Sequence, residues 1–124
     1  MTSPLIEVLQ QGKGLTVYGI VNDRGECEAK LWLAALPPVA KVQFRARLER
    51  LADQGFLRAT EEWRQLECPG NPPVHEIKVR SGYRLYMVRH GKHWVSTHGA
   101  KKPKDKKVCQ QAETTRETWK ESQR

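Results

Sequence analysis

The residues best suited to chemistry lie in the second half of the chain, where cations and aromatic rings alternate with apolar side chains. Residues 74–80, 83–89 and 92–98 alternate as β-strands do, so that successive side chains point to opposite faces. Alternate positions of the three segments, which we call the cationic parity, would share one face of the sheet. They are Glu76, Lys78, Arg80, Arg84, Tyr86, Val88, Trp94, Ser96 and His98. Cations between rings can bind phosphates and stack on bases, as a sheet face does with single-stranded RNA. A solvated outer face with cross-strand pairs explains the pattern equally well.

Among the histidines, His98 is the best candidate for proton transfer. It ends the third segment on the cationic parity, and an imidazole titrates near neutral pH. His75 lies on the apolar parity, where a packed histidine at a strand end is expected. His90 and His93 flank a turn without acidic or thiol ligands beside them, so we expect no metal site and no cofactor.

A lysine-rich segment follows the third strand. Lys101 and Lys102 directly extend the cationic face and are expected to contact phosphate. Long-range attraction of RNA is expected from the more distant residues Lys104, Lys106 and Lys107. The alternative is a solvated loop that only separates a strand from a helix.

The elements that position these residues follow from the same periodicity. The three segments predict an antiparallel meander with turns at 81–82 and 90–91. Its other parity predicts a buried face formed by Ile77, Val79, Tyr83, Leu85, Met87 and Val95. Such a sheet normally packs one face against helices.

The rest of the chain supplies those helices. Residues 15–21 predict a strand, and apolar stripes predict helices over 26–36 and over 39–54, the second ending at Gly55. Residues 108–122 can form a terminal helix. We expect an α+β fold with an antiparallel sheet, two N-terminal helices on one face and a C-terminal helix. Residues 15–122 would form a single domain, preceded by a leader of uncertain order over 1–14.

Charge is distributed unevenly along the 124 residues. Residues 1–62 hold 8 Lys+Arg and 8 Asp+Glu, whereas residues 63–124 hold 14 and 6, so the net charge of +8 lies entirely in the second half. This asymmetry favours a polyanion partner such as RNA, because neutralised phosphates release counterions. A tail that only keeps the protein soluble is the alternative. No apolar run approaches a membrane span, so no membrane partner is expected.

The three cysteines, Cys27, Cys68 and Cys109, are far apart and form no C-x-x-C motif. Their odd number and spacing indicate neither a disulfide framework nor a zinc knuckle, so we expect buried or idle thiols in a reducing cytoplasm.

Three motifs give the chain a family resemblance: His-Glu-Ile-Lys-Val-Arg (75–80), Gly-Tyr-Arg-Leu-Tyr (82–86) and Thr-His-Gly-Ala-Lys-Lys (97–102). With the order of elements, they resemble the phage-derived, HigB-like branch of the RelE/ParE toxin superfamily, over 15–119. The resemblance implies a RelE-like toxin of a toxin–antitoxin pair, which cuts mRNA on the ribosome and is restrained by a helix-turn-helix antitoxin. Its site positions would be Glu76, Arg80, Arg84, Tyr86, His98, Lys101 and Lys102. Ala100 stands where the family usually has an aromatic residue, and Pro103-Lys104-Asp105 replaces a common Thr-Pro.

The reaction implied is metal-independent attack of a ribose 2′-OH on the adjacent phosphate. Arg84 and Arg80 would bind the phosphate, and Lys101 or Lys102 the phosphate or the leaving group. His98 or Tyr86 would transfer protons, with Trp94 and Lys78 contacting RNA. Two alternatives remain: a nucleic-acid-binding module without catalysis, and a toxin that inhibits DNA gyrase, as one branch of the superfamily does.

Overall fold

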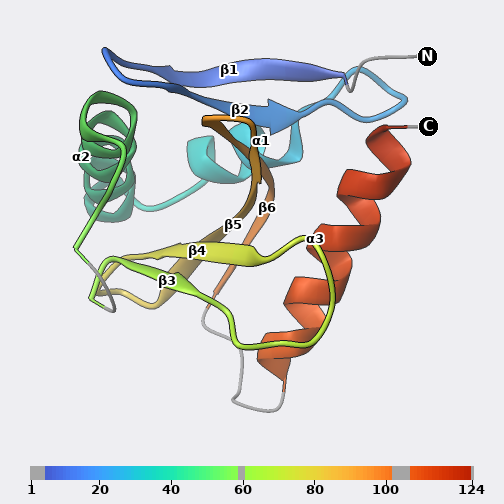
Figure 1. The fold of residues 1–124 in the computed structure, drawn as a ribbon. Coiled ribbons are helices and arrows are strands. Elements are labelled where there is room, and N and C mark those ends of the chain that lie inside the picture. Colours follow the sequence, from blue (N-terminus) through green and yellow to red (C-terminus); the bar gives the residue numbers. More distant parts are fainter. Residues whose placement is uncertain (1–4, 59–60, 102–106, 124) are drawn as a thin grey trace.

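The computed structural model describes residues 5–58, 61–101 and 107–123. The elements along the chain are β1 (Ile6–Gln11), β2 (Thr16–Ile20), α1 (Glu28–Ala34), α2 (Pro38–Gln54), β3 (Trp63–Gln65), β4 (Val74–Lys78), β5 (Tyr83–His90), β6 (His93–Lys101) and α3 (Val108–Ser122) (Figure 1). None of the helices in the described ranges is both long and apolar enough to span a bilayer.

Within the described residues, six strands form one sheet in the order β1-β2-β6-β5-β4-β3. Neighbouring strands are antiparallel except β2 and β6, which run parallel with Val17 opposite Trp94. The prediction of an antiparallel sheet is therefore wrong: the sheet is mixed. A parallel pair requires a long crossover connection, and α1 and α2 lie within the chain that follows β2. Strands β1 and β3 form the two edges.

Several individual elements are confirmed. β4, β5 and β6 form the predicted antiparallel meander. Both N-terminal helices and the terminal helix are present, and α2 ends at Gly55, whose φ of 85° is a left-handed conformation that suits glycine. Within the expected leader, residues 6–11 form β1, which pairs with β2.

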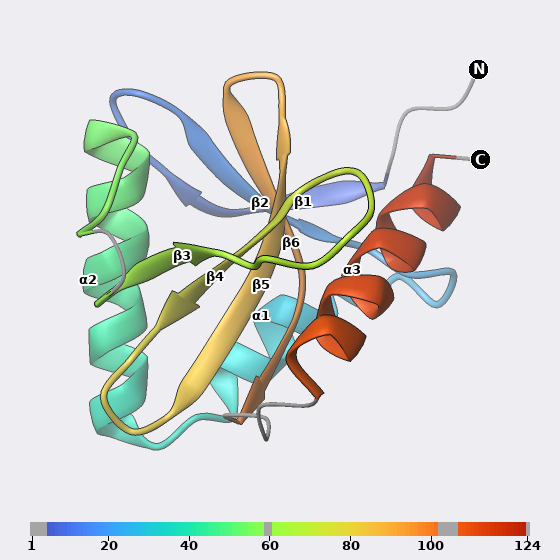
Figure 2. The same ribbon diagram turned by 60° about the horizontal axis from the view of Figure 1, so that its bottom comes forward.

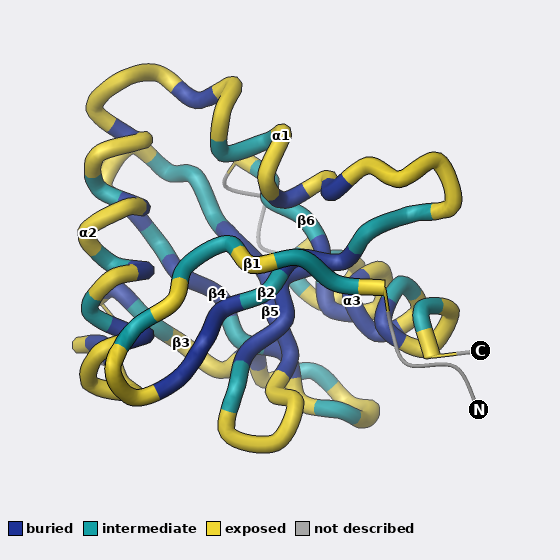
Figure 3. Tube along the Cα trace, turned by 90° about the horizontal axis from the view of Figure 1, so that it is seen from above, coloured by how far each residue is buried: buried dark blue, intermediate teal, exposed yellow. Residues whose placement is uncertain are grey.

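The sheet is covered on both faces (Figure 2). Helices α1 and α2 pack on one face, over a cluster that includes Phe44, Leu48 and the predicted core residues Leu85 and Met87. Helix α3 packs on the other face through Ala112 and Trp119, which join a second cluster. Figure 3 shows the consequence, since the central strands are buried and exposure is concentrated on the outer sides of the helices and in the loops. The face expected to be open to solvent is therefore largely covered by α3.

A β-bulge in β6 changes which side chains share a face. Tyr86 lies opposite His98 but Met87 lies opposite Ser96, so Thr97 is an extra residue in β6. Because of this extra residue, the side chains of β6 before Thr97 point to the opposite faces from those that strict alternation predicts. Val95 therefore joins the cluster under α3, and Trp94 joins the cluster under α1 and α2.

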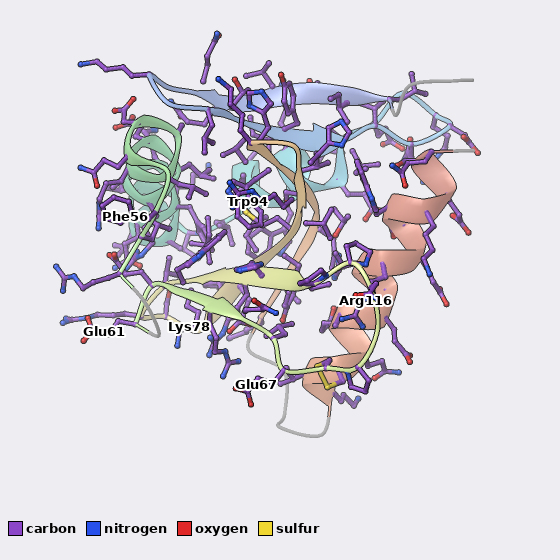
Figure 4. The ribbon with its side chains drawn as sticks, in the orientation of Figure 1. Phe56, Glu61, Glu67, Lys78, Trp94 and Arg116 are labelled. Carbon is purple, nitrogen blue, oxygen red and sulfur yellow. A yellow bond between two sulfur atoms is a disulfide. The ribbon has the colours of Figure 1, made fainter. Side chains whose placement is uncertain are left out.

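Two ties hold α3 to the loop between β3 and β4. Cys68 in that loop forms a disulfide with Cys109 in the first turn of α3, so the expectation of three unpaired thiols is wrong for this pair. Their separation of 41 residues carried no signal of the contact. Buried Arg116 also donates hydrogen bonds to the carbonyl oxygens of Cys68, Pro69 and Pro72, at 2.8–3.0 Å (Figure 4). Cys27 is a buried free thiol.

Candidate functional site

A row of polar side chains crosses four strands under α3. The strand register places Arg64 of β3 opposite Glu76 of β4, Glu76 opposite Tyr86 of β5, and Tyr86 opposite His98 of β6. Gln111 of α3 continues the row, since its Oε1 lies 2.7 Å from Nε2 of His98. We call Arg64, Glu76, Tyr86, His98 and Gln111 the polar row.

Glu76 is the only carboxylate of the polar row, and its side chain is 1% exposed. Its Oε2 accepts hydrogen bonds from Nε of Arg64 at 3.1 Å and from Nη1 of Arg84 at 3.0 Å, and Nη2 of Arg64 lies 2.9 Å away in an ion pair. One buried negative charge therefore faces two guanidinium groups. The pairing offsets the cost of burying Glu76, and it leaves an excess of one positive charge beside it.

Tyr86 is fully buried, and its hydroxyl has no hydrogen-bond partner among the described residues. Burial raises the pKa of Tyr86 to about 12, and the negative charge of Glu76 acts in the same direction, whereas Arg84 and Arg64 oppose it. The phenol is therefore neutral near pH 7. A fully buried, neutral phenol is suited to positioning its neighbour, and its ring lies 5.1 Å from the ring of His98, tilted by 30°.

His98 is half-buried and is held through both ring nitrogens. Thr97 Oγ1 lies 3.0 Å from its Nδ1, and Gln111 Oε1 lies 2.7 Å from its Nε2. The bulge makes the first contact available, because it turns Thr97 towards α3, where its hydroxyl also donates to Thr115. His98 thus sits in a prepared hydrogen-bond network.

Cations lie next to the row at the start of β5. Arg84 occupies the same face as Tyr86 two residues earlier, and it lies opposite Ala100, so a small side chain separates its position from that of His98 along β6. On its other side Arg84 lies opposite Lys78, which puts two like charges directly across the strands. Glu76 supplies a counter-charge there, since its Oε2 accepts a hydrogen bond from Nη1 of Arg84.

The remaining predicted site residues are distributed differently. The expectation that Lys101 extends the cationic face is wrong. It is exposed opposite Tyr83, on the face under α1 and α2, because side chains alternate along β6, and its Nζ lies 5.8 Å from the centroid of that ring. Arg80 is exposed in the turn after β4, and Lys107 is exposed directly before α3. The predictions for Lys102, Lys104 and Lys106 fall outside the described residues.

The expectation that Trp94 stacks on bases from the cationic face is wrong. Its side chain lies on the other face because of the bulge, is 4% exposed, and packs against Trp63 and His75 with ring centroids 4.8 Å apart. Ser96 is displaced with it, and its hydroxyl donates to the carbonyl oxygen of Tyr86.

Arg64 and Gln111 are members of the site that sequence reasoning missed. Arg64 lies in a three-residue strand, too short for the period-2 alternation that identified β4, β5 and β6. Gln111 lies on α3, and the packing of this helix on the cationic face was not predicted from the sequence. The one available signal was the spacing of Val108, Ala112 and Trp119, which predicts an apolar stripe on that helix.

The described residues contain no group of three or more His, Cys, Asp and Glu side chains arranged to hold a metal ion. The arrangement offers instead two arginines that share a buried carboxylate, a partly exposed histidine in a hydrogen-bond network and a neutral buried phenol. These groups can bind an anion and move a proton beside it. No protein-family model matches this chain, and the curated proteins also gave no match.

Proposed function

We propose that this protein is an endoribonuclease toxin of the HigB-like branch of the RelE/ParE superfamily, which cleaves mRNA on the ribosome without a metal ion. The observation that carries the proposal is the placement of Arg84, Tyr86 and His98 on one face around Ala100. A phosphate above Ala100 would lie between a guanidinium group and an imidazole.

Each side chain then has a distinct task. Arg84 stabilises the charge that builds on the phosphate oxygens as the ribose 2′-OH attacks. His98 exchanges the hydrogen bond between its Nε2 and Gln111 for one with the 5′-oxygen, to which it gives a proton as the P–O5′ bond breaks, while water takes the proton of the attacking 2′-OH. Tyr86 is a positioning residue, because it is fully buried and its ring packs on that of His98.

The proposal includes the setting of the reaction. Translated mRNA places the protein in the cytoplasm, and a helix-turn-helix antitoxin would hold it silent there. Thiols are kept reduced in most cytoplasms, so Arg116 alone would then tie α3 to the loop between β3 and β4.

The test is cleavage of a translated mRNA in a purified translation system, with RNA binding measured in parallel. Arg84→Ala should lower the cleavage rate by about 10²-fold or more, and His98→Ala by about 10²–10⁴-fold, while binding changes little for His98→Ala. Exposed Arg45→Ala, on α2, is the control and should cut at the parental rate. If the parent never cuts RNA, with or without ribosomes, the proposed endoribonuclease activity is refuted. DNA damage signalling in cells that express the protein, without mRNA cleavage, would identify a gyrase inhibitor.

A second function is favoured by one observation. Both nitrogens of His98 are already engaged and the hydroxyl of Tyr86 is inaccessible, which also suits a nucleic-acid-binding module without catalysis. Such a module would bind RNA equally well after His98→Ala and would not arrest growth when induced.

A further inference from the structure

A cleft beside the polar row is lined mainly by cations. It has a volume of about 610 Å³ and lies between α2, the segment before β3 and the turn that joins β4 to β5. Figure 4 shows Lys78 and Glu61 at this end of the molecule. The lining consists of Arg47, Arg58, Glu61, Glu62, Lys78, Val79, Arg80 and Arg84. Five cations against two carboxylates leave a net charge of +3 on the lining.

Two arginines in the lining have hydrogen-bond donors that nothing in the described chain satisfies. The Nε atoms of Arg47 and Arg84 are buried and form no hydrogen bond among the described residues, although that of Arg47 lies 3.4 Å from Oε2 of Glu62 in an ion pair; both side chains line this cleft. These side chains are 14% and 13% exposed. A buried donor without an acceptor is costly, so two of them around one cavity indicate a missing acceptor there.

The carboxylates near the cleft are already engaged by other cations. Glu62 lies 2.7 Å from Arg50 and 3.4 Å from Arg47, Glu61 lies 3.3 Å from Arg58, and Glu76 is held by Arg64 and Arg84. Burial lowers the pKa of Arg47, and although Glu62 opposes this effect, three neighbouring arginines add to it. The side chains that line the cleft therefore include more cations than carboxylates.

We propose that this cleft is a phosphate subsite, in which Arg47 and Arg84 bind the phosphodiester next to the one that is cleaved. The inference rests on the proposed function and extends it, since the substrate would be single-stranded RNA with at least one further linkage beyond the scissile one. Guanidinium forks suit a phosphate, whose several oxygens can accept from two arginines at once. The volume is within the range of sites that hold nucleotide-sized ligands. Arg84 joins the subsite to the polar row.

Side-chain NMR of the full chain tests the site directly. The arginine Nε–H resonances are followed during titration with inorganic phosphate, and then with an oligoribonucleotide made uncleavable by a single 2′-deoxy substitution. The resonances of Arg47 and Arg84 should shift with both probes, whereas Arg45, which is exposed on the same helix and lies outside the cleft, should not. Equal shifts at all three, or none at Arg47, would overturn the proposal. Shifts with phosphate but not with the oligonucleotide would overturn the assignment to RNA.

A matched pair of variants measures the contribution to binding. Arg47→Gln should weaken binding of the uncleavable oligonucleotide by about 10-fold and lower the salt dependence of log Kd by about one unit, as expected for one lost phosphate contact. Arg45→Gln should change neither. Arg50 still pairs with Glu62 in Arg47→Gln, and urea denaturation checks that the variant folds.

The outcomes separate this inference from the proposed function. An Arg47 effect on binding in a protein that never cleaves RNA would support the subsite and refute the catalysis. Cleavage by a protein in which Arg47→Gln has no effect on RNA binding would support the catalysis and refute the subsite.

Discussion

The two faces of the sheet are built on different principles. The face under α1 and α2 is closed by large apolar side chains, with Phe44, Leu48, Leu85 and Met87 all buried. The face under α3 contains an apolar cluster too, but it also buries Glu76, Thr97, Thr115 and Arg116. Burial of polar groups adds little or no net stability compared with apolar packing of the same volume.

The difference shows where function is most strongly indicated. The apolar face explains why the sheet folds. The α3 face holds the polar row, a buried phenol without a hydrogen-bond partner among the described residues, and a histidine whose two ring nitrogens each contact a side chain. A disulfide and Arg116 tie its helix to the loop between β3 and β4. Local departures from the most stable packing concentrate at functional sites.

Reduction of the Cys68–Cys109 disulfide should destabilise the protein and act on the α3 face. A cross-link that spans 41 residues is expected to contribute about 4 kcal/mol to the free energy of unfolding by restricting the unfolded chain. Urea denaturation with and without a thiol reductant measures the loss, and hydrogen exchange should accelerate in α3 before α2. The Cys68→Ser, Cys109→Ser double variant is the control and should not respond to reductant. Identical unfolding with and without reductant would show that the disulfide contributes nothing.

Loss of the carboxylate in the polar row should be the next largest effect. Glu76→Ala leaves Arg64 and Arg84 without their shared counter-charge, and breaking a buried ion pair from one side costs about 3 kcal/mol of unfolding free energy. Glu61→Ala breaks an exposed pair with Arg58 and should cost less than about 1 kcal/mol. Equal losses in urea denaturation would mean that the polar row is solvated and that the contrast between the faces is overstated.

The sequence predicted local features of the fold better than the arrangement of its sheet. Period-2 alternation identified β4, β5 and β6 because the side-chain pattern of a strand is local. It also placed Arg84, Tyr86 and His98 on one face, as the strand register shows. The parallel pairing of β2 with β6 joins segments more than seventy residues apart, as Val17 opposite Trp94 illustrates, and depends on contacts that no local pattern records.

The errors in the site have two physical causes. One extra residue at Thr97 reverses strand parity, so Trp94 and Val95 exchanged faces relative to the prediction. The docking of α3 then buried Tyr86, and no alternation within β5 could show what would cover it. A bulge and a tertiary contact thus decide which predicted residues reach the surface.

Alkaline pH should destabilise the α3 face through Tyr86. The folded-state pKa is raised from 10 to about 12, so between these values the unfolded chain releases a proton that the folded chain retains, and stability falls as pH rises. The full loss is about 2–3 kcal/mol, from two pKa units. Tyr86→Phe should remove this difference, and at pH 7 it should be at least as stable as the parent because the hydroxyl has no partner among the described residues. Urea midpoints between pH 9 and 11 provide the measurement. Urea midpoints that change with pH in the same way for the parent and Tyr86→Phe would refute the raised pKa of Tyr86.

Acidic pH should destabilise the opposite face, through His75, and this effect should be the smallest of the four. His75 stacks on Trp63 with ring centroids 4.9 Å apart and also contacts Trp94, and its Nδ1 is buried without a partner among the described residues. Burial lowers its pKa, and the positive charge of Arg89 acts in the same direction.

The unfolded chain therefore binds a proton at His75 more readily than the folded chain does. The stability that His75 contributes is complete above the unfolded-state value of 6.5 and is lost as pH falls below it towards the lowered folded-state pKa. Because the ring is only half-buried, water screens part of the effect, which places it below that of Tyr86. Urea midpoints of the parent and His75→Phe, compared from pH 8 to pH 5, should diverge as pH falls. A divergence that instead grows towards pH 8 would show that the folded protein favours the imidazolium form, and it would remove the contrast in which one face responds to acid and the other to alkali.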